Sequence, residues 1–364
     1  MRDILGVEDY EAYMKPFGGK SVVLEGDFRQ ILPVVPSGSR SDIVFSTINS
    51  SYLWDSCKIY TLSRNMRLQM SDDPIQREEL REFAEWMLKV GDGVLGLPND
   101  GEAEIEIPDE LLLDDFDNPL EAIFDVAFPD IFSNFGYAAY LKDRAILAPT
   151  LEIVEQVNNF IMNKLPGEER EYLSSDSVDT HGQPYNIAAQ VVPPAILNDL
   201  KVYGLPNHSL TLKVGTPIML LRNLDQTAGL CNRTRLIVTH LGDHVIGADV
   251  ISGGGVGQTV FITRMSMCPS ESRLPFKLKR RQFPITVSYC MTINKSQGQS
   301  LGNVIVYLPR PIFTHGQIYV AVSRVKSKKG LKFLILHDNG NSIKTTRNVV
   351  YKEIFQNVVA QSQV

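Results

Sequence analysis

The fold is decided by two stretches, Thr292-Ile-Asn-Lys-Ser-Gln-Gly-Gln-Ser300 and Tyr319-Val-Ala-Val-Ser-Arg-Val-Lys-Ser327. Between them the apolar run Val304–Leu308 predicts a buried strand. Thr314 and Gln317 have the spacing of a capping box, which predicts that a helix starts there. Small and cationic residues flanking a buried strand place both stretches at the edge of an α/β core.

The predicted helix would deliver Arg324 to its end, beyond an apolar stretch. A guanidinium on a rigid element suits a phosphate, because it stays charged and its planar fork fits the oxygens. A lone Ser-Arg is more often a surface arginine paired with a carboxylate. The presence of both stretches in this order favours phosphate binding by Arg324.

The N-terminal part also alternates between strand and helix patterns. Residues 21–24, Ser-Val-Val-Leu, predict a strand. Ligands of such sheets bind at the carboxyl ends of the strands, so Gln30 is expected to face a cleft. A helix is predicted at about 74–90, with Asp73 capping its start and Gly91 closing its end.

A second strand–helix unit opens at residues 145–148, and Thr150 can cap its helix. Strand then capped helix is typical of a parallel sheet. From about 200 to 284, short alternating strands and glycine turns predict an inserted antiparallel barrel. The α/β pattern then resumes through residues 331–336. The predicted helix has a buried apolar face made of Ile153, Val154, Val157, Phe160 and Ile161.

The net charge of −6 hides an asymmetry, since residues 1–130 carry a net −16 and residues 131–364 a net +10. The stretch Asp100 to Asp130 holds 12 acids and no Lys or Arg. It predicts a solvated loop or weak helix, with a basic partner as the alternative. The basic half is where a nucleic-acid backbone would lie. One basic cluster has two possible interpretations, a solvated face or a DNA contact. It consists of Arg273, Lys277, Lys279, Arg280 and Arg281.

Composition excludes several classes of protein. No stretch approaches the ~20 apolar residues of a membrane span, and the N-terminus lacks a signal-peptide layout. The four cysteines form no C-x-x-C, which indicates a reducing compartment. His240 and His244 are four apart, but no nearby cysteine pair completes a zinc site, so no metal site is predicted.

Several blocks, in this order, resemble the second half of superfamily-one DNA helicases of the Pif-one family, in its plant and transposon-associated branch. Gly26–Val34 is similar to the third helicase motif and Leu62–Arg67 to the fourth. Residues 212–224 and 229–232 are similar to the small β-barrel insertion of that family. Any one block is weak, but together they cover the chain from about residue 1 to residue 354.

The resemblance implies an α/β fold of RecA-like parallel-sheet domains, the first one partial, with a small SH3-like β-barrel insertion in the second. Residues 1–138 would be the remainder of the first domain, including an acidic segment at 99–130. Residues 139–200 and 285–364 would form the second domain, and residues 201–284 the inserted barrel.

The family's ATPase centre needs a P-loop, G-x-x-x-x-G-K-[ST] between a strand and a helix. Gly19-Lys20-Ser21 does not fit, because Met14 stands where the leading glycine belongs and the residues after it are strand-like. The acidic pair that would hold Mg²⁺ has no candidate either. The chain resembles a member that begins after its magnesium motif: a truncated gene model, a decayed transposon copy or a deliberate fragment.

The resemblance implies ATP between the two RecA-like domains and single-stranded DNA across both. By position, Gln30 resembles the glutamine that senses the terminal phosphate, Arg67 the fourth-motif arginine, and Arg324 the arginine supplied from the second domain. Gln297 and Gly298 would approach the nucleotide. The expected DNA contacts are Asn294, Lys295, Ser296, Arg280 and Arg281.

Two positions depart from the branch. Glu25 stands where the branch usually has glycine, and Arg233 replaces the glycine of an Asn-Gly hairpin. An arginine in a left-handed conformation would cost on the order of 1–2 kcal/mol.

The first functional hypothesis is an ATP-dependent 5′-3′ DNA helicase that uses ATP and Mg²⁺, present here as its C-terminal part and inactive alone. The second is a non-catalytic remnant that binds single-stranded DNA, and the third a structural protein unrelated to DNA. Expected partners are single-stranded DNA and duplex junctions, with no membrane and a monomeric state. The expected location is the nucleus, with an organelle as the alternative, and the expected roles are DNA repair, recombination and telomere maintenance.

Overall fold

The computed structural model describes residues 1–7, 10–63, 65–66, 73–97, 100–178, 192–269, 274–337 and 339–361. The chain divides into two compact units, Met1–Leu112 with Leu308–Val364 (unit 1) and Leu113–Tyr307 (unit 2). The domain boundaries expected from the sequence lie at other positions and stay predictions. Among the described residues, no helix has the length and apolarity needed to cross a bilayer.

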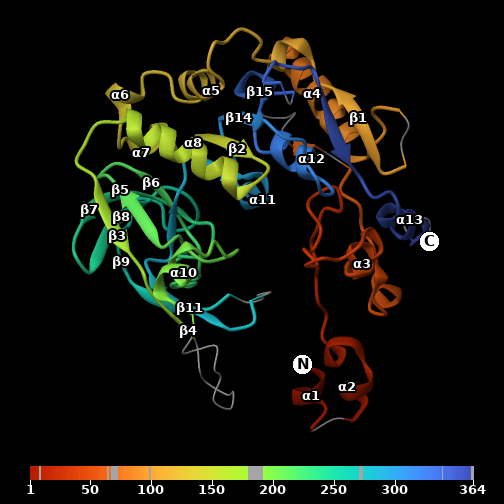
Figure 1. Ribbon diagram of the computed structural model, residues 1–364. Coiled ribbons are helices and arrows are strands. Elements are labelled where there is room, and N and C mark those ends of the chain that lie inside the picture. Colours follow the sequence, from red (N-terminus) through yellow and green to blue (C-terminus); the bar gives the residue numbers. More distant parts are fainter. Residues whose placement is uncertain are drawn as a thin grey trace. The chain divides into compact units, whose positions relative to one another are not determined.

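Unit 1 combines the two ends of the chain (Figure 1). Its helices are α1 (Arg2–Leu5), α2 (Tyr10–Met14), α3 (Arg40–Phe45), α4 (Pro74–Gly91), α12 (Gln317–Val322) and α13 (Glu353–Gln361), with short 3₁₀ turns at Pro16–Gly19, Ile48–Ser50, Trp54–Ser56, Asp109–Leu111 and Lys328–Gly330. Its strands are β1 (Glu102–Glu106), β15 (Leu331–Ile335) and β16 (Thr345–Val349).

The predicted helix at 74–90 is confirmed as α4. Asp73 accepts a hydrogen bond from the backbone N–H of Ile75, and Pro74 occupies the first turn, where its missing N–H costs nothing. The prediction that Gly91 ends the helix is wrong, because the helix continues through Gly91 and its cap lies one residue later. Gly91 is still helical and buried, Asp92 is the C-terminal cap, and Gly93 takes the left-handed conformation with φ 63°.

The predicted strand at residues 21–24 is wrong. These residues have no regular secondary structure, and Val23 is 94% exposed. A strand exists through hydrogen bonds to a neighbour, and no described strand pairs with this segment. Apolar, β-branched composition alone was therefore insufficient to make a strand here.

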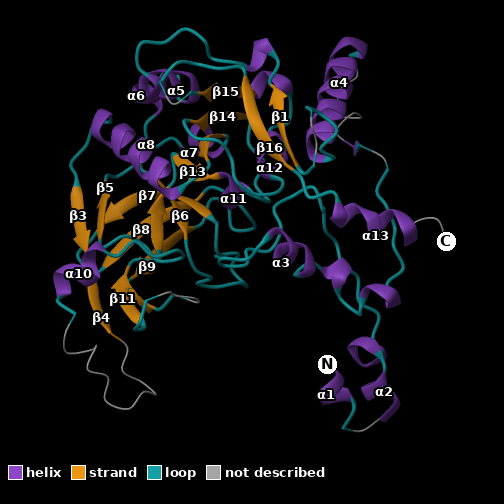
Figure 2. Ribbon diagram, turned by 45° about the vertical axis from the view of Figure 1, so that its right-hand side comes forward, coloured by secondary structure: helices purple, strands orange, loops and turns teal. Residues whose placement is uncertain are grey.

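The acidic stretch is more ordered than the predicted loop. β1 pairs antiparallel with β16, and Figure 2 shows the two strands side by side. The sequence Glu-Ala-Glu-Ile-Glu alternates with period two, so Ala103 and Ile105 are buried while the glutamates face outward. Ile105 is Cα partner to Thr346 across this ribbon.

In unit 1, lysines near the C-terminus of the same chain pair with residues of the acidic stretch. Lys344 Nζ lies 2.6 Å from Asp109 Oδ1, and Lys332 Nζ donates to the carbonyl of Glu110 at 2.7 Å. Lys328 pairs with the Glu110 carboxylate, whose pKa is lowered by that hydrogen bond. The C-terminal lysines of the chain thus neutralise part of its acidic excess locally.

Unit 2 carries the parallel sheet and the inserted strands. Its helices are α5 (Pro119–Ala127), α6 (Ile131–Asn134), α7 (Ala138–Lys142), α8 (Leu151–Lys164), α10 (Pro194–Asp199) and α11 (Ile293–Ser296). Its strands are β2 (Arg144–Ala148), β3 (Arg170–Leu173), β4 (Ser175–Val178), β5 (Ser209–Leu212), β6 (Pro217–Leu220), β7 (Arg235–Leu241), β8 (Val245–Val250), β9 (Thr259–Thr263), β10 (Met265–Met267), β11 (Leu278–Gln282), β12 (Ile285–Val287), β13 (Cys290–Thr292) and β14 (Asn303–Leu308), the last reaching the boundary.

The strands β13, β2 and β14 lie next to one another and run parallel. Ile146 of the central β2 pairs with Cys290 on one side and with Ile305 on the other. The helix α8 begins as predicted, because Thr150 accepts from the N–H of Ile153. Four residues of its predicted apolar face are buried and the fifth, Phe160, is half-buried. A parallel strand covered by a capped helix is the expected βα unit, so this prediction is confirmed.

The inserted region is antiparallel, as predicted. Five strands follow the order β12-β6-β7-β8-β9, and two smaller sheets pair β3 with β5 and β11 with β10 and β4 (Figure 2). The five-stranded sheet and the β3–β5 pair share an apolar core that includes Leu220, Leu236 and Phe283, whereas Met267 of β10 and Leu278 of β11 belong to a second cluster. The prediction of an α/β fold with a parallel sheet and an inserted antiparallel part is therefore confirmed.

Two buried cations tie the inserted strands to the parallel-sheet part of unit 2. Arg235 of β7 donates to the carbonyls of Leu141, Lys142 and Arg144, so it satisfies acceptors at the end of α7. Burial lowers its pKa to about 10. Lys213 Nζ donates to the carbonyls of Met162 and Leu165 at the end of α8, at 2.8 and 2.7 Å.

Candidate functional site

The turn at residues 27–30 in unit 1 is organised by the carboxylate of Asp27. Asp27 Oδ1 accepts from the backbone N–H of Arg29 at 3.1 Å, and Oδ2 accepts from Gln30 Nε2 at 3.3 Å. The backbone N–H of Gln30 closes the turn onto the Asp27 carbonyl at 3.0 Å. An aspartate that bonds the backbone two residues on is a common turn device. The turn therefore holds the predicted phosphate sensor, Gln30, in a defined place.

Two neighbouring helices clamp this turn. Tyr319 of α12 donates its hydroxyl proton to Asp27 Oδ2 at 2.9 Å, and Arg29 Nε donates to Asp92 Oδ1, at the end of α4, at 2.6 Å. Burial, and then the charge of Asp27, raises the pKa of Tyr319 well above its usual value, so the phenol stays a neutral donor. The phenol therefore keeps the proton that it donates to Asp27.

Gly316, directly before α12, touches the same turn. Its φ is +74°, and a Cβ placed on it would lie 2.4 Å from the carbonyl oxygen of Arg29. Both the left-handed backbone and the close approach require glycine here. The predicted capping box is wrong for this reason: Gly316 is the N-cap, and Gln317 Oε1 instead accepts from the N–H groups of Phe313 and Thr314.

His315 is fully buried and connects the turn to the C-terminal segment. Its Nε2 lies 2.8 Å from the carbonyl oxygen of Phe28, and its Nδ1 accepts from the N–H of Tyr351 at 2.8 Å. Since a carbonyl only accepts, these partners assign the proton to Nε2. Burial lowers the pKa of His315, which keeps the ring neutral.

Arg324 lies two residues beyond the end of α12, as the sequence predicted. It is 7% exposed, and its Nε donates to the carbonyl of Val320 at 2.8 Å while Nη2 donates to Ser323 Oγ at 2.8 Å. Its charge acts to lower the pKa of Tyr319, against the dominant burial. Arg324 and Gln30 therefore flank the Asp27–Tyr319 hydrogen bond within unit 1, whereas Arg67 lies outside the described residues.

The second predicted group lies on α11 of unit 2 and the loop after it. Thr292 caps the helix by accepting from the N–H of Lys295. Asn294, Lys295 and Gln297 are half-buried, and Gly298 is exposed with φ +82°. Ser296 is fully buried, and its Oγ donates to the carbonyl of Ile293 at 2.7 Å. That burial argues against Ser296 as a direct DNA contact.

Lys295 lies in a positive environment. Burial, and then the charge of Arg233, lowers its pKa to about 8. The carbonyl of Arg233 accepts from Gln299 Nε2 at 3.4 Å, which joins the hairpin at 231–234 to the loop after α11. The structure thus places Arg233, noticed in the sequence only as a departure, beside a predicted DNA-binding lysine.

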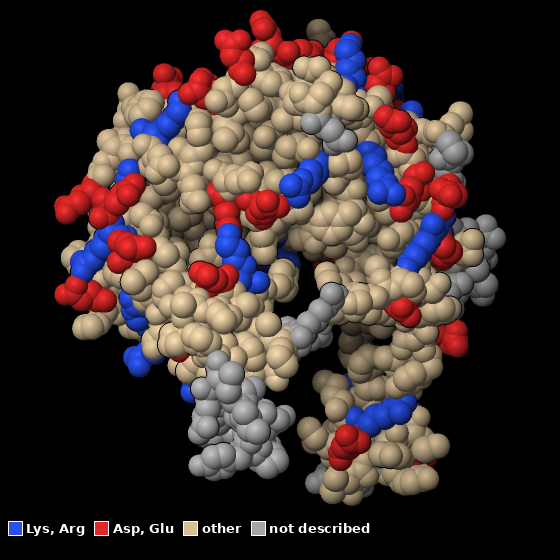
Figure 3. All heavy atoms as spheres, viewed as in Figure 1, with Lys and Arg blue, Asp and Glu red and all other residues tan. Residues whose placement is uncertain are grey.

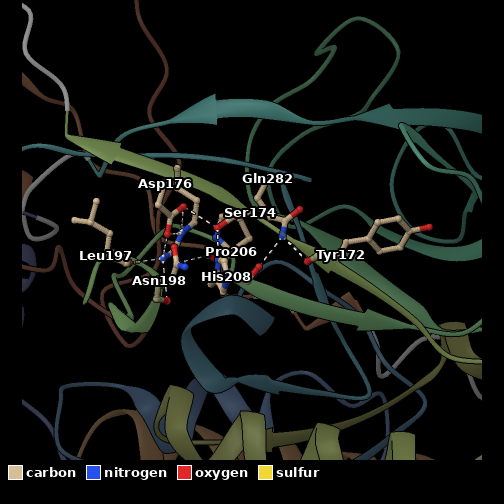
Figure 4. A network of polar contacts seen from close by, with 9 residues as sticks. Tyr172, Ser174, Asp176, Leu197, Asn198, Pro206, His208 and Gln282 are labelled. Atoms are coloured by element: carbon tan, nitrogen blue, oxygen red, sulfur yellow. Dashed lines mark hydrogen bonds and ion pairs between the residues drawn. The ribbon is translucent and has the colours of Figure 1, made fainter. Parts of the chain in front are cut away.

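Arg280 and Arg281 do not share an environment, although the sequence assigned both to DNA. Arg280 is 1% exposed and pairs with the fully buried Asp176, its cross-strand partner, at 2.6 Å (Figure 4). It also donates to the carbonyls of Leu197 and Pro206. Successive residues of a strand point to opposite faces, so Arg281 is exposed while Arg280 is structural. The assignment of Arg280 to DNA is corrected accordingly.

The other residues of the basic cluster also differ in their exposure to solvent. Lys277 is exposed and Lys279 half-buried, and Arg273 lies outside the described residues. On the face drawn in Figure 3, the coloured Lys and Arg side chains are interspersed with Asp and Glu. On that face the described residues form no continuous basic surface, so a nucleic-acid backbone would depend on a few cations.

The described residues do not fit a magnesium–nucleotide cradle. Gly19 ends a 3₁₀ turn, Lys20 is extended, and no helix follows Ser21, so this segment is not a P-loop, as predicted. In the described part of the chain, no group of three His, Cys, Asp or Glu could hold a metal ion.

Two sequence profiles match parts of the chain. The PIF1-like helicase profile matches residues 1–101, and the 2B domain of DNA helicase Pif1 matches residues 195–241. These ranges contain the clamped turn and the start of the inserted strands. Over these residues the chain is similar to PIF1-like helicases.

Relatives and solved structures agree with this family. The ATP-dependent DNA helicase PIF1 of Xenopus laevis is 26% identical over 330 residues, which cover 88% of this chain and 42% of that protein. The crystal structure of the Pif1 helicase from Candida albicans matches with a TM-score of 0.62 at 21% identity, over all of this chain and 74% of that one. A Bacteroides Pif1 complex with ADP-AlF3 and ssDNA matches with a TM-score of 0.58 at 19% identity, covering 100% and 72%. The chain spans about two fifths of the length of the curated relative, and the solved structures establish the likeness in fold.

The PIF1-like assignment puts the two departures in context. Glu25 is exposed and is not among the residues with positive φ, so a side chain there causes no backbone strain. Arg233 has φ +75°, the left-handed conformation expected from the lost Asn-Gly turn. His315 and Tyr319 were not assigned roles from the sequence, because no local pattern reveals partners nearly 300 residues away.

Proposed function

We propose that this chain is the part of an ATP-dependent 5′-3′ DNA helicase that runs from the third helicase motif to the C-terminus. One observation carries the proposal: Gln30 and Arg324, the predicted phosphate sensor and arginine finger, flank one hydrogen bond, between Asp27 and Tyr319. The two residues lie 294 positions apart in the sequence, and the fold of unit 1 brings both to this hydrogen bond.

The chain's own share of the chemistry is positioning and charge. ATP hydrolysis in such enzymes is mostly the placing of the terminal phosphate and neutralisation of its developing charge. Gln30, held by Asp27, can orient a hydrogen bond toward that phosphate, and Arg324 supplies a permanent cation. An arginine in this role is typically worth ~10³–10⁵ in rate. By resemblance to the family, Gln297 and Gly298 are proposed as further nucleotide contacts.

The proposed DNA contacts are Asn294, Lys295 and the exposed Arg281, with single-stranded DNA and duplex junctions as the partners. Solved relatives support the partner class, since they include a Bacteroides Pif1 bound to ssDNA and two Pif1 helicases at forked dsDNA. We also propose membership of the plant and transposon-associated branch, a nuclear location with an organelle as the alternative, and roles in repair, recombination and telomere maintenance. Resemblance alone supports these finer proposals.

The experiment joins this chain to a segment that carries a P-loop and the acidic magnesium motif of a curated relative. DNA-stimulated ATP turnover is expected in the joined protein and not in the 364-residue chain. Arg324→Ala should lower turnover by at least ~10³ and leave DNA affinity unchanged, while Arg310→Ala, an exposed arginine of unit 1, serves as the matched control. Turnover by the 364-residue chain alone that Arg324→Ala abolishes would contradict the proposal.

A second candidate is a non-catalytic protein that binds single-stranded DNA, and the net charge of +10 of residues 131–364 supports it. The same experiment separates the two. Binding without turnover in the joined protein favours the second candidate, because the catalytic groups would then be present but out of place.

A further inference from the structure

Arg233 is an arginine held in a backbone conformation that favours glycine. Its φ is +75°, which costs on the order of 1–2 kcal/mol for a residue with a Cβ. The loop nevertheless keeps it there: the Arg233 N–H donates to the carbonyl of Leu220 at 2.9 Å, and the Thr234 N–H donates to the carbonyl of Cys231 at 3.0 Å. The guanidinium is therefore presented by a rigid hairpin rather than by a free loop.

The same hairpin is bonded to the segment that follows α11. Gln299 Nε2 donates to the Arg233 carbonyl at 3.4 Å, so residue 233 lies against the loop that contains Gly298. Lys295 is near enough for the charge of Arg233 to act on it. Two segments separated by about 60 residues thus bring two cations together within unit 2.

Neither cation is neutralised by an acid of the described residues. No carboxylate in that part of the chain forms an ion pair with Arg233 or Lys295, in contrast to Lys213, Arg170 and Arg280, which each pair with an acid. Two like charges in a half-buried place repel each other more strongly than in water. An anion bound between them would remove that repulsion and satisfy donors of both side chains.

We propose that Arg233 and Lys295 together bind one backbone phosphate of single-stranded nucleic acid. The guanidinium can take two oxygens in its fork, and the ammonium adds a point charge. This proposal rests on the proposed function and adds to it a contact that the Asn-Gly hairpin of the family cannot make.

A diester of the strand fits this pair better than a nucleoside triphosphate does. A diester carries one negative charge against the +2 of this pair and needs no metal ion, whereas a triphosphate carries several charges and is normally held with Mg²⁺. In the described part of the chain no cluster of acids could hold that ion. Gly298, in the loop after α11, is exposed, and a Cβ placed on it would meet no described atom within 4 Å.

The test measures binding of an oligothymidylate to the 364-residue chain by fluorescence anisotropy, over a range of salt and pH. Arg233→Gly should weaken binding about tenfold and reduce the slope of log K against log salt by about 0.7, the value for one lost contact on a single strand. Lys142→Ala, which removes one exposed charge of unit 2, should change neither quantity. Arg233→Lys should restore part of the loss.

A pH series gives a second, independent readout. Bound phosphate stabilises the Lys295 ammonium, so the affinity of the unaltered chain should fall as pH rises above about 8. In Arg233→Gly this fall should move to higher pH, because the neighbouring positive charge is gone. Lys295→Gln should remove this dependence of the affinity on pH.

The outcomes separate this proposal from the function on which it rests. Strong DNA binding with an unchanged salt slope and pH profile in Arg233→Gly overturns the Arg233–Lys295 site alone. Weakened binding of ATP with unchanged binding of the oligonucleotide also overturns it, in favour of a nucleotide. Failure of the unaltered, folded chain to bind any oligonucleotide overturns both proposals.

Discussion

Tyr319 donates a hydrogen bond of 2.9 Å to the carboxylate of Asp27, and through it helix α12 holds the turn that carries Gln30. The two residues belong to different helicase-like motifs at opposite ends of the chain. Their contact shows that residues 26–34 and residues 319–327 act as one structural piece of unit 1. A substitution at either end of this hydrogen bond should therefore affect the other.

Tyr319→Phe is expected to destabilise the chain by about 1.5–3 kcal/mol, because a hydrogen bond to a charged group is lost. The lower end applies, since Asp27 keeps its bonds to Arg29 and Gln30. Denaturant midpoints measure the effect. Tyr203→Phe, at a site that is 73% exposed, is the matched control and should leave the midpoint unchanged. An equal midpoint in both variants would mean that the turn is held by other contacts.

His315 should make stability depend on pH. Its folded pKa lies below the usual value of about 6.5, because burial disfavours the charged ring. The unfolded chain therefore binds the proton first, so the contribution is complete above pH ~6.5 and is lost as pH falls toward the folded pKa. The melting temperature measured from pH 8 to pH 5 should show this loss.

His315→Gln can replace both hydrogen bonds without titrating. It should lower stability at pH 8 and flatten the decline between pH 6.5 and 5. Carboxylates elsewhere contribute to both proteins equally, so the difference between the two curves isolates the histidine. Parallel curves would exclude His315 as the source of the pH dependence.

Arg233→Gly should stabilise the fold by about 1 kcal/mol, since glycine adopts φ +75° without strain. The same variant is expected to weaken DNA binding, because it removes half of the proposed phosphate site. Arg233→Ala is the control for the removed side chain, because alanine keeps the strain. If the glycine variant melts earlier than the unaltered chain, the arginine side chain makes a contact whose stabilisation exceeds the backbone strain at residue 233.

Arg280 and Arg281 should respond in opposite ways to substitution. Arg280→Ala leaves Asp176 buried without its partner and should cost about 3–5 kcal/mol. Arg281→Ala should leave the denaturation midpoint within about 0.5 kcal/mol and reduce the salt slope of single-stranded DNA binding by about 0.7. A normal midpoint for Arg280→Ala would contradict the structural role assigned to the pair.

Elements with local patterns could be predicted from the residues alone. The caps Asp73 and Thr150, the apolar stripe of α8 and the buried strands β2 and β14 follow from spacing and residue type, and the structure confirms them. The alternation of the inserted strands also identified an antiparallel region. These features need only neighbours a few residues apart, because helix and strand periods are set by the backbone.

Which charged groups meet depends on contacts between segments that are distant in the sequence. The sequence offered Arg280 and Arg281 as equal DNA contacts, and pairing of β11 with β4 buried one against Asp176 and exposed the other. It also gave no sign that His315 would bond Phe28, or that Arg233 would lie beside Lys295. Such partners depend on how distant segments pack, and no local period encodes that packing.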